Sequence, residues 1–395
     1  MHKLMRRTLV SLSLLALPLV ANASGARIQA LNVPGDYVKD YTGIYTYVSG
    51  VGSVGNLVWA EPGNGGNNAM GAVLGNLWDG KLGTWGMTFR AAAPTLGQPM
   101  FGDPVTTSAI GFGDFNQTGE ALDLLWGHKM GSGSLGLRLN RSFISNEVTA
   151  GTSEGNGNNG RNIWGLGAGF GFAMSSNTDV EVSGLFQNRS FKGSNFNTPD
   201  AAADNGGSTY QIAARAMMKR GSNLVLVPVA KLYSFDRSAV SAAAVATDEK
   251  ISGWSFGLAG NWTLGSDDLF VLGGNIVGNK FEQTVGAAPT STVNETFYPN
   301  LFMALETQTN SWLTLRFGAQ NALMYSAKAE AGSPVVTQTI KQHNFTFNTG
   351  ATVKAGSLTF DATLTPQFYN NPVSATFNNG LGNTPFGRVS ATYSF

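Results

Sequence analysis

The chain has 395 residues, with 25 Lys and Arg against 24 Asp and Glu, so its net charge of +1 offers no strongly basic surface for nucleic acid. It contains no Cys, which excludes a disulfide framework and thiolate chemistry. Charged residues make up only 12% of the chain, about half the usual share, whereas Gly accounts for 51 residues.

The first 23 residues have the pattern of a secretory signal peptide. A basic start that ends at Arg7 precedes an apolar run from Leu9 to Val20, and the small-x-small sequence Ala21-Asn22-Ala23 follows. The run is short for a membrane helix, although a short transmembrane anchor is the alternative. We expect residues 1–23 to be removed by cleavage after Ala23, and no Cys follows that site to carry a lipid.

We expect residues 24–52 to form a separate N-terminal segment ahead of the barrel, either periplasmic or a plug. Pro34-Gly35-Asp36 predicts a turn, with Asp36 as the N-cap of a short helix. The helical spacing of Tyr37, Tyr41, Tyr45 and Val48 supports that helix. Two interpretations remain open: a helix that serves only for packing, or a plug that controls passage.

Residues 53–395 alternate between polar and apolar side chains over stretches about twice as long as the usual strand of a soluble sandwich. An exported chain without a membrane helix can cross a membrane only as a closed barrel, because only closure pairs every backbone group. The sequence therefore predicts an all-β, antiparallel, up-and-down transmembrane β-barrel. The clearest alternating stretches are 164–172, 254–264, 313–323, 344–353 and 358–369.

The connections predict the number of strands. Seven short turns alternate with eight longer segments, which gives sixteen strands with both termini on the periplasmic side. The strand near 54–60 has the weakest pattern, so fourteen strands is the alternative. The turns lie near Asp79, Gly131, Ser175, Gly221, Gly265, Gln308 and Ala355, and the longer segments are 62–67, 91–119, 144–161, 192–207, 237–250, 283–294, 327–338 and 371–384.

The chain ends in an alternating strand that contains Val389, Ala391, Tyr393 and Phe395. This ending resembles the C-terminal assembly signal of bacterial outer-membrane β-barrel proteins, and by that resemblance the chain is porin-like, without a match to a porin subfamily. The resemblance implies the outer membrane of a Gram-negative bacterium as the location. It also implies outer-membrane lipids and the barrel-assembly machinery as partners.

The polar faces of the strands predict a charged lumen. Six cations against three acids favour mild anion selectivity, unless these groups pair with one another or with loops. The long segment 91–119 could narrow the pore with Asp103 and Asp114, or lie on the surface. The glycine stripe at 165, 167, 169 and 171 is expected to leave room for a loop or the N-terminal segment. The predicted pore-lining residues are Arg138, Glu181, Arg189, Arg215, Lys231, Glu306, Arg316, Asp361 and Arg388.

Catalysis is not expected. Past the leader the chain has only His128 and His343, which share strand parity with apolar residues and lie at opposite barrel ends, so they cannot orient one nucleophile. We predict no catalytic, metal or cofactor site. The sequence favours a channel for passive diffusion of small hydrophilic solutes, of undetermined oligomeric state. The alternatives are a plugged barrel for hydrophobic substrates, suggested by the apolar face of 225–229, or a structural or adhesive surface protein.

Overall fold

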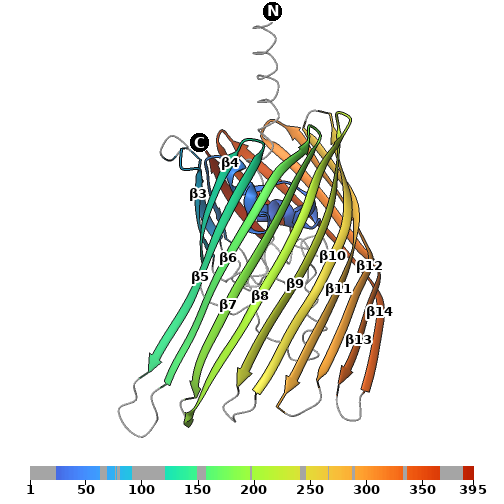
Figure 1. Ribbon diagram of the computed structural model, residues 1–395. Helices are drawn as coiled ribbons and strands as arrows, with labels where there is room; N and C mark the ends of the chain where they lie inside the picture. The colour runs from blue at the N-terminus through green and yellow to red at the C-terminus, as the bar shows by residue number, and fades with distance from the viewer. Residues whose placement is uncertain are drawn as a thin grey trace, which may run out of the picture.

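The computed structural model describes residues 24–62, 69–75, 77, 81–90, 121–148, 157–195, 198–240, 246–265, 267–286, 290–331, 336–364 and 386–395. Sixteen antiparallel strands close into one barrel, in which β1 pairs with β16 (Figure 1). The strands are β1 Leu57–Glu61, β2 Ala69–Leu74, β3 Thr84–Arg90, β4 Ala121–Met130, β5 Gly133–Val148, β6 Gly157–Ser175, β7 Thr178–Asn195, β8 Thr198–Arg220, β9 Leu224–Val240, β10 Ala246–Leu264, β11 Asp268–Val285, β12 Ser291–Asn310, β13 Leu313–Ala331, β14 Val336–Ala355, β15 Leu358–Leu364 and β16 Phe386–Ser394.

The sixteen-strand prediction is confirmed, and the alternative of fourteen is wrong. The weakest predicted strand exists as β1, and its five residues pair on both sides, with β2 and with β16. Connections of two or three residues follow β4, β6, β8, β10, β12 and β14. We call the end of the barrel that holds these turns and the C-terminus the turn end, and the opposite end the loop end (Figure 1).

The strands are longer than the sequence predicts. Strands β5 to β14 contain 16 to 23 residues, whereas β1 to β4, β15 and β16 contain 5 to 10. The predicted loop 192–207 is largely strand, since Arg189 pairs with Gly207 and Gly193 with Ala203. Backbone pairing continues there without the apolar alternation on which the prediction depended. One side of the barrel wall therefore extends much further toward the loop end (Figure 1).

The two faces of the wall differ in polarity. Along β5, Leu137 and Leu139 are exposed on the outside, while Arg138 and Asn140 are buried inside. Large apolar side chains cover the outside of the barrel, as contact with lipid requires. No helix among the described residues is long and apolar enough to cross a membrane. The exposed outer residues include Leu124, Leu166, Phe186, Ile212, Leu232, Phe256, Leu258, Leu272, Met303, Phe317, Phe347, Val353 and Phe360.

Residues 24–56, the inner segment, lie inside the barrel near the turn end (Figure 1). They form one α-helix and three short 3₁₀ helices: α2 Gly25–Leu31, η2 Gly35–Tyr37, η3 Tyr41–Tyr45 and η4 Val48–Ser53. The predicted short helical segment exists, but a continuous helix from Tyr37 to Val48 is wrong. Asp36 lies within η2, and Asp40 instead caps η3 by accepting from the Gly43 amide at 3.1 Å.

The walls on two sides of the barrel bind the inner segment through apolar contacts. Tyr41, Ile44, Val48, Val51 and Val54 pack against wall residues Leu57, Trp59, Val73, Leu125 and Leu185. Across the lumen, Leu31, Val33, Tyr37 and Val38 pack against Val227, Val229, Ala259, Val271, Phe302 and Ala304. The tyrosines that suggested one helix face thus face different walls: Tyr37 lies 4.8 Å from Phe302, and Tyr41 lies 5.0 Å from Trp59, between ring centroids. These tertiary contacts override the helical spacing.

Glycines in the wall let the inner segment approach the strands closely. A Cβ at Gly136 would lie 1.9 Å from the carbonyl oxygen of Val48, and one at Gly318 would lie 1.8 Å from that of Leu31. The predicted stripe has the same role, since a Cβ at Gly169 would lie 2.8 Å from the Ser49 nitrogen. The expectation that the stripe makes room for the N-terminal segment is confirmed.

Candidate functional site: the barrel interior

A buried ion-pair cluster connects helix α2 to the wall. The guanidinium of Arg27 donates twice to Glu306, at 2.7 Å each. Arg316 donates to the same carboxylate at 2.5 Å and to Asp361 at 2.9 Å. Asp361 also accepts from the Ser24 hydroxyl at 2.8 Å, and this hydroxyl caps α2 by accepting from the Arg27 amide. Two acids on the wall therefore hold the start of the inner segment.

Glu61 connects the inner segment to the strand pair that closes the barrel. Its carboxylate accepts from the Gly25 amide at 2.8 Å, from the Tyr41 hydroxyl at 2.6 Å and from Arg388 at 2.5 Å. Glu61 belongs to β1 and Arg388 to β16, so their ion pair crosses the closing seam. Burial, with the nearby Glu61 charge, raises the pKa of Tyr41 well above its usual value. Tyr41 therefore remains a neutral donor.

Three further pairs lie around the inner segment. Arg138 donates to Asp123 at 2.8 Å and to the Tyr45 carbonyl at 2.8 Å. Arg215 donates to Glu181 at 2.6 Å and to the Asp36 carbonyl at 3.1 Å. Its guanidinium carbon lies 3.9 Å from the centroid of the Tyr47 ring. Lys231 pairs with Asp36 at 2.7 Å.

Asp40 is the acid of the inner segment that has the least compensation. It is buried, and the hydrogen bonds from Thr42 and Gly43 both go to Oδ1, whereas Oδ2 has no hydrogen-bond partner. Burial raises the pKa of Asp40, against smaller lowering effects from Arg27 and from its two hydrogen bonds. An ionised Asp40 is therefore costly inside the barrel.

The structure places eight of the nine predicted pore-lining residues inside the barrel, and all eight are paired. They are Arg138, Glu181, Arg215, Lys231, Glu306, Arg316, Asp361 and Arg388. Arg189 lies in β7, but its side chain is outside the described set, as are Asp103 and Asp114. The pairing removes the basis for the expected anion selectivity, since each described cation of the set has an acidic partner.

Sequence reasoning missed four charged residues that complete these clusters: Arg27, Asp36, Glu61 and Asp123. Asp123 could have been found, because it has the opposite parity to Leu124 and Trp126 in β4. Glu61 carried no such signal, since β1 turns apolar residues, Leu57 and Trp59, inward against the inner segment. Arg27 and Asp36 belong to the inner segment, where the polar–apolar alternation of strands does not apply and so cannot predict which wall residues they meet.

Toward the loop end the inward face carries a network of neutral polar side chains. Asn300 donates to Asn275 at 2.8 Å, and Gln187 donates to Asn140 at 3.0 Å. Tyr233 donates to Asn279. These residues are at most 4% exposed, so water reaches little of their surface in this state.

The two histidines lie on the outside of the barrel. His128 stacks on Trp126, with ring centroids 5.9 Å apart, and His343 is exposed. Among the described residues no group of three His, Cys, Asp or Glu side chains could hold a metal ion. The lack of catalysis stays a prediction.

The C-terminal strand shows the same two faces. Tyr393 and Phe395 are exposed on the outside and stack with ring centroids 5.8 Å apart. Val389 and Ala391 are partly buried on the same face, and Arg388 points inward. Recognition of these four residues by the assembly machinery stays a prediction.

A closed antiparallel barrel with an even number of strands, an apolar outside and a charged, polar inside fits only one type of membrane protein. The chain is a bacterial outer-membrane β-barrel protein. No known family matches its sequence, and no curated protein does.

Solved structures of similar shape are also outer-membrane barrels. The alcaligin receptor FauA from Bordetella pertussis aligns with a TM-score of 0.44 and 10% identity, covering 78% of this chain and 42% of that one. The toluene transporter TodX from Pseudomonas putida aligns with a TM-score of 0.41 and 11% identity, covering 95% of this chain and 99% of that one. The translocator domain of the autotransporter NalP from Neisseria meningitidis aligns with a TM-score of 0.31 and 11% identity, covering 68% of this chain and 90% of that one. This chain thus spans less than half of FauA, and likeness at this level says nothing about cargo.

Proposed function

We propose that this barrel is an outer-membrane transport channel for small hydrophilic solutes, and that the inner segment narrows it at the turn end. The observation that carries the proposal is the polar inward face beside the inner segment, where Gln320, Thr346 and Asn348 lie on the neighbouring strands β13 and β14 and keep part of their surface accessible. A polar lining of this kind suits solutes that exchange hydrogen bonds with water for hydrogen bonds with the wall.

The inner segment is suited to act as the constriction. Helix α2 contacts strands β12 to β16, η2 contacts β9 and η4 contacts β3 to β7, so the segment reaches across the lumen. Short turns mark the periplasmic end of outer-membrane barrels, which places the constriction on the periplasmic side. The ion pairs of Arg27 and Asp36 with the wall fix its position.

Planar-bilayer conductance tests this function. The full protein should give small steps, and a variant without residues 24–52 should give steps several-fold larger, because the lumen is wider there. Retention of the compact, heat-modifiable form on gels would show that the variant barrel is folded. Absence of conductance in both the full protein and the folded variant would contradict the channel and the constriction together. Equal, measurable conductance in the two would contradict the constriction alone.

An apolar cluster supports a second function, the passage of hydrophobic substrates. Phe235, Ile251, Phe281 and Val293 meet on the inward side of β9 to β12, further from the turn end than the inner segment. The face of Val227 and Val229, which suggested such a role, instead packs against the inner segment. Quenching of naphthalene fluorescence by the full protein, lost in Phe281→Ser, would favour this function. Absence of quenching would contradict the passage of hydrophobic substrates.

A further inference from the structure

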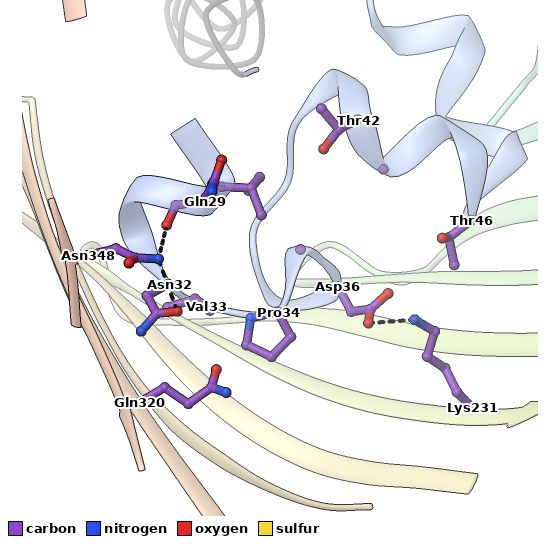
Figure 2. A pocket seen from close by; sticks show the side chains of 13 residues that line it. Gln29, Asn32, Val33, Pro34, Asp36, Thr42, Thr46, Lys231, Gln320 and Asn348 are labelled. Atoms are coloured by element: carbon purple, nitrogen blue, oxygen red, sulfur yellow. Dashed lines mark hydrogen bonds and ion pairs between the residues drawn. The ribbon is translucent and has the colours of Figure 1, made fainter. Parts of the chain in front are cut away.

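A pocket lies where the inner segment meets the wall. Its volume is about 390 Å³, near the lower end of the range for small-molecule sites. The inner segment contributes residues from Ile28 to Asp36 and from Thr42 to Thr46, and the wall contributes Lys231, Gln320 and Asn348 (Figure 2). The pocket is large enough for one small solute.

The pocket lies on the side of the inner segment that faces the loop end. Gln320 is seven residues along β13 from its start at Leu313, and Lys231 is seven residues along β9 from Leu224. Arg316, in the cluster under α2, is only three residues from Leu313. Four residues of a tilted strand correspond to about 10 Å along the barrel axis. A solute that crosses from the loop end would meet this pocket before the ion-pair cluster.

Some polar groups of the pocket are already used to hold its shape. Asn348 donates to the Gln29 carbonyl at 2.8 Å (Figure 2). Asn32 donates to the Thr346 hydroxyl at 2.8 Å. The side chains of Gln29, Gln320 and Thr46 make no hydrogen bond within the described part of the chain. These two amides and one hydroxyl are therefore available to a ligand as donors and acceptors.

The charges of the pocket compensate each other. Asp36 and Lys231 are the charged residues that line it, and they form an ion pair at 2.7 Å (Figure 2). A charged ligand would have to break this pair or remain uncompensated. Ile28, Val33 and Pro34 add apolar surface beside the polar groups. The lining thus suits a neutral molecule that has many hydroxyl groups and some C–H surface.

We propose that this pocket binds a neutral polyhydroxylated solute of one or two sugar rings, with hydroxyls on the Asp36–Lys231 pair and on Gln320. The assignment names a substrate class for the proposed channel, and so rests on that function. Carboxylate, ammonium and amide groups together can both accept from and donate to adjacent hydroxyls. A site of this kind ahead of the constriction would concentrate the solute at the narrow part of the lumen.

Saturation-transfer NMR with maltose, on the full protein in detergent, tests the assignment. Maltose should give saturation transfer, and Gln320→Leu should weaken its binding about five- to tenfold, because one side-chain hydrogen-bonding group is lost. Gln308→Leu makes the same chemical change at the exposed end of β12, and should bind maltose as the wild type does. Unaltered binding in Gln320→Leu, or no binding by the wild type, would overturn the site.

Competition separates neutral from zwitterionic ligands. Glycine should not displace maltose if the Asp36–Lys231 pair stays intact, and displacement by glycine at equal concentration would overturn the assignment to neutral solutes. The result is independent of the channel proposal. Conductance without maltose binding would remove only this site, whereas binding without conductance would keep the site and contradict the channel.

Discussion

Two guanidinium groups, from Arg27 and Arg316, share the carboxylate of Glu306 inside the barrel. Glu306→Gln would leave both cations buried with one compensating charge fewer, so we expect a loss of about 3–5 kcal/mol in the free energy of unfolding. Urea unfolding in detergent micelles measures this loss. The control is Glu282→Gln, which affects the more exposed pair with Lys280 and should cost at most about 1 kcal/mol. Equal losses in both variants would contradict a structural role for the cluster.

Asp40 predicts a pH dependence. Burial raises its pKa in the folded protein, so the folded state binds the proton more tightly than the unfolded state. The favourable contribution of protonated Asp40 to the free energy of unfolding is complete below the pKa of about 3.9 that Asp has in the unfolded chain. It is lost as the pH rises through the higher pKa of Asp40 in the folded protein. Asp40→Asn keeps an acceptor for Gly43 and removes the charge. We expect it to be more stable than the wild type at neutral pH, with a flatter urea-midpoint profile above pH 4; an unchanged profile would contradict this.

At the residue scale, strand parity predicted which cations point inward, but could not predict how they are neutralised. Arg138 and Arg316 were identified because they alternate with apolar residues that face lipid. The partners of Lys231 and Arg388 depend on the path of the inner segment and on an inward apolar face in β1. The sequence therefore suggested an excess of positive charge, which the described inward-facing residues do not have.

At the scale of elements, the fit between helix α2 and strand β13 depends on one glycine. Gly318→Ala would place a methyl group where the Leu31 carbonyl lies, so the end of α2 must move away from the wall. We expect trypsin to cleave the inner segment of the folded variant, at Arg27 or Lys39, at least tenfold faster than in the wild type.

Gly184→Ala is the matched control for this substitution. A Cβ there would meet no atom within 4 Å, so the cleavage rate should not change. Equal cleavage of the wild type and of Gly318→Ala would mean that the close contact does not hold the segment.

The elements also show where periodicity stops being informative. The tyrosine spacing in 37–48 indicated one helix, but Asp40 caps a new 3₁₀ helix and the non-helical backbone of Tyr47 separates η3 from η4. Each short helix then follows a different wall. A segment enclosed by a barrel has no single buried face, so a test for one apolar stripe does not describe it.

At the scale of the whole molecule, the turns determined the strand number correctly because a connection of two or three residues needs Gly or a small polar residue. Gly131, Gly221, Gly265 and Gly356 have positive φ and mark four of these turns. Strand length was underestimated because apolar alternation is required only across the bilayer, about 25 Å of the barrel height. Strands such as β8, with 23 residues, continue in backbone pairing beyond that height.

The closing seam has a consequence for the order in which the molecule assembles. Glu61 of β1 meets Arg388 of β16 only after nearly the whole chain has been placed, and closing so long a loop is entropically the most demanding pairing in the barrel. Helix α2 rests on β12 to β16, the strands synthesised last. The inner segment leaves the ribosome before any strand, yet half of its binding surface does not exist until the barrel is complete. Docking of α2 therefore requires these last strands, whereas η4 meets its partners β3 to β7 earlier in the chain.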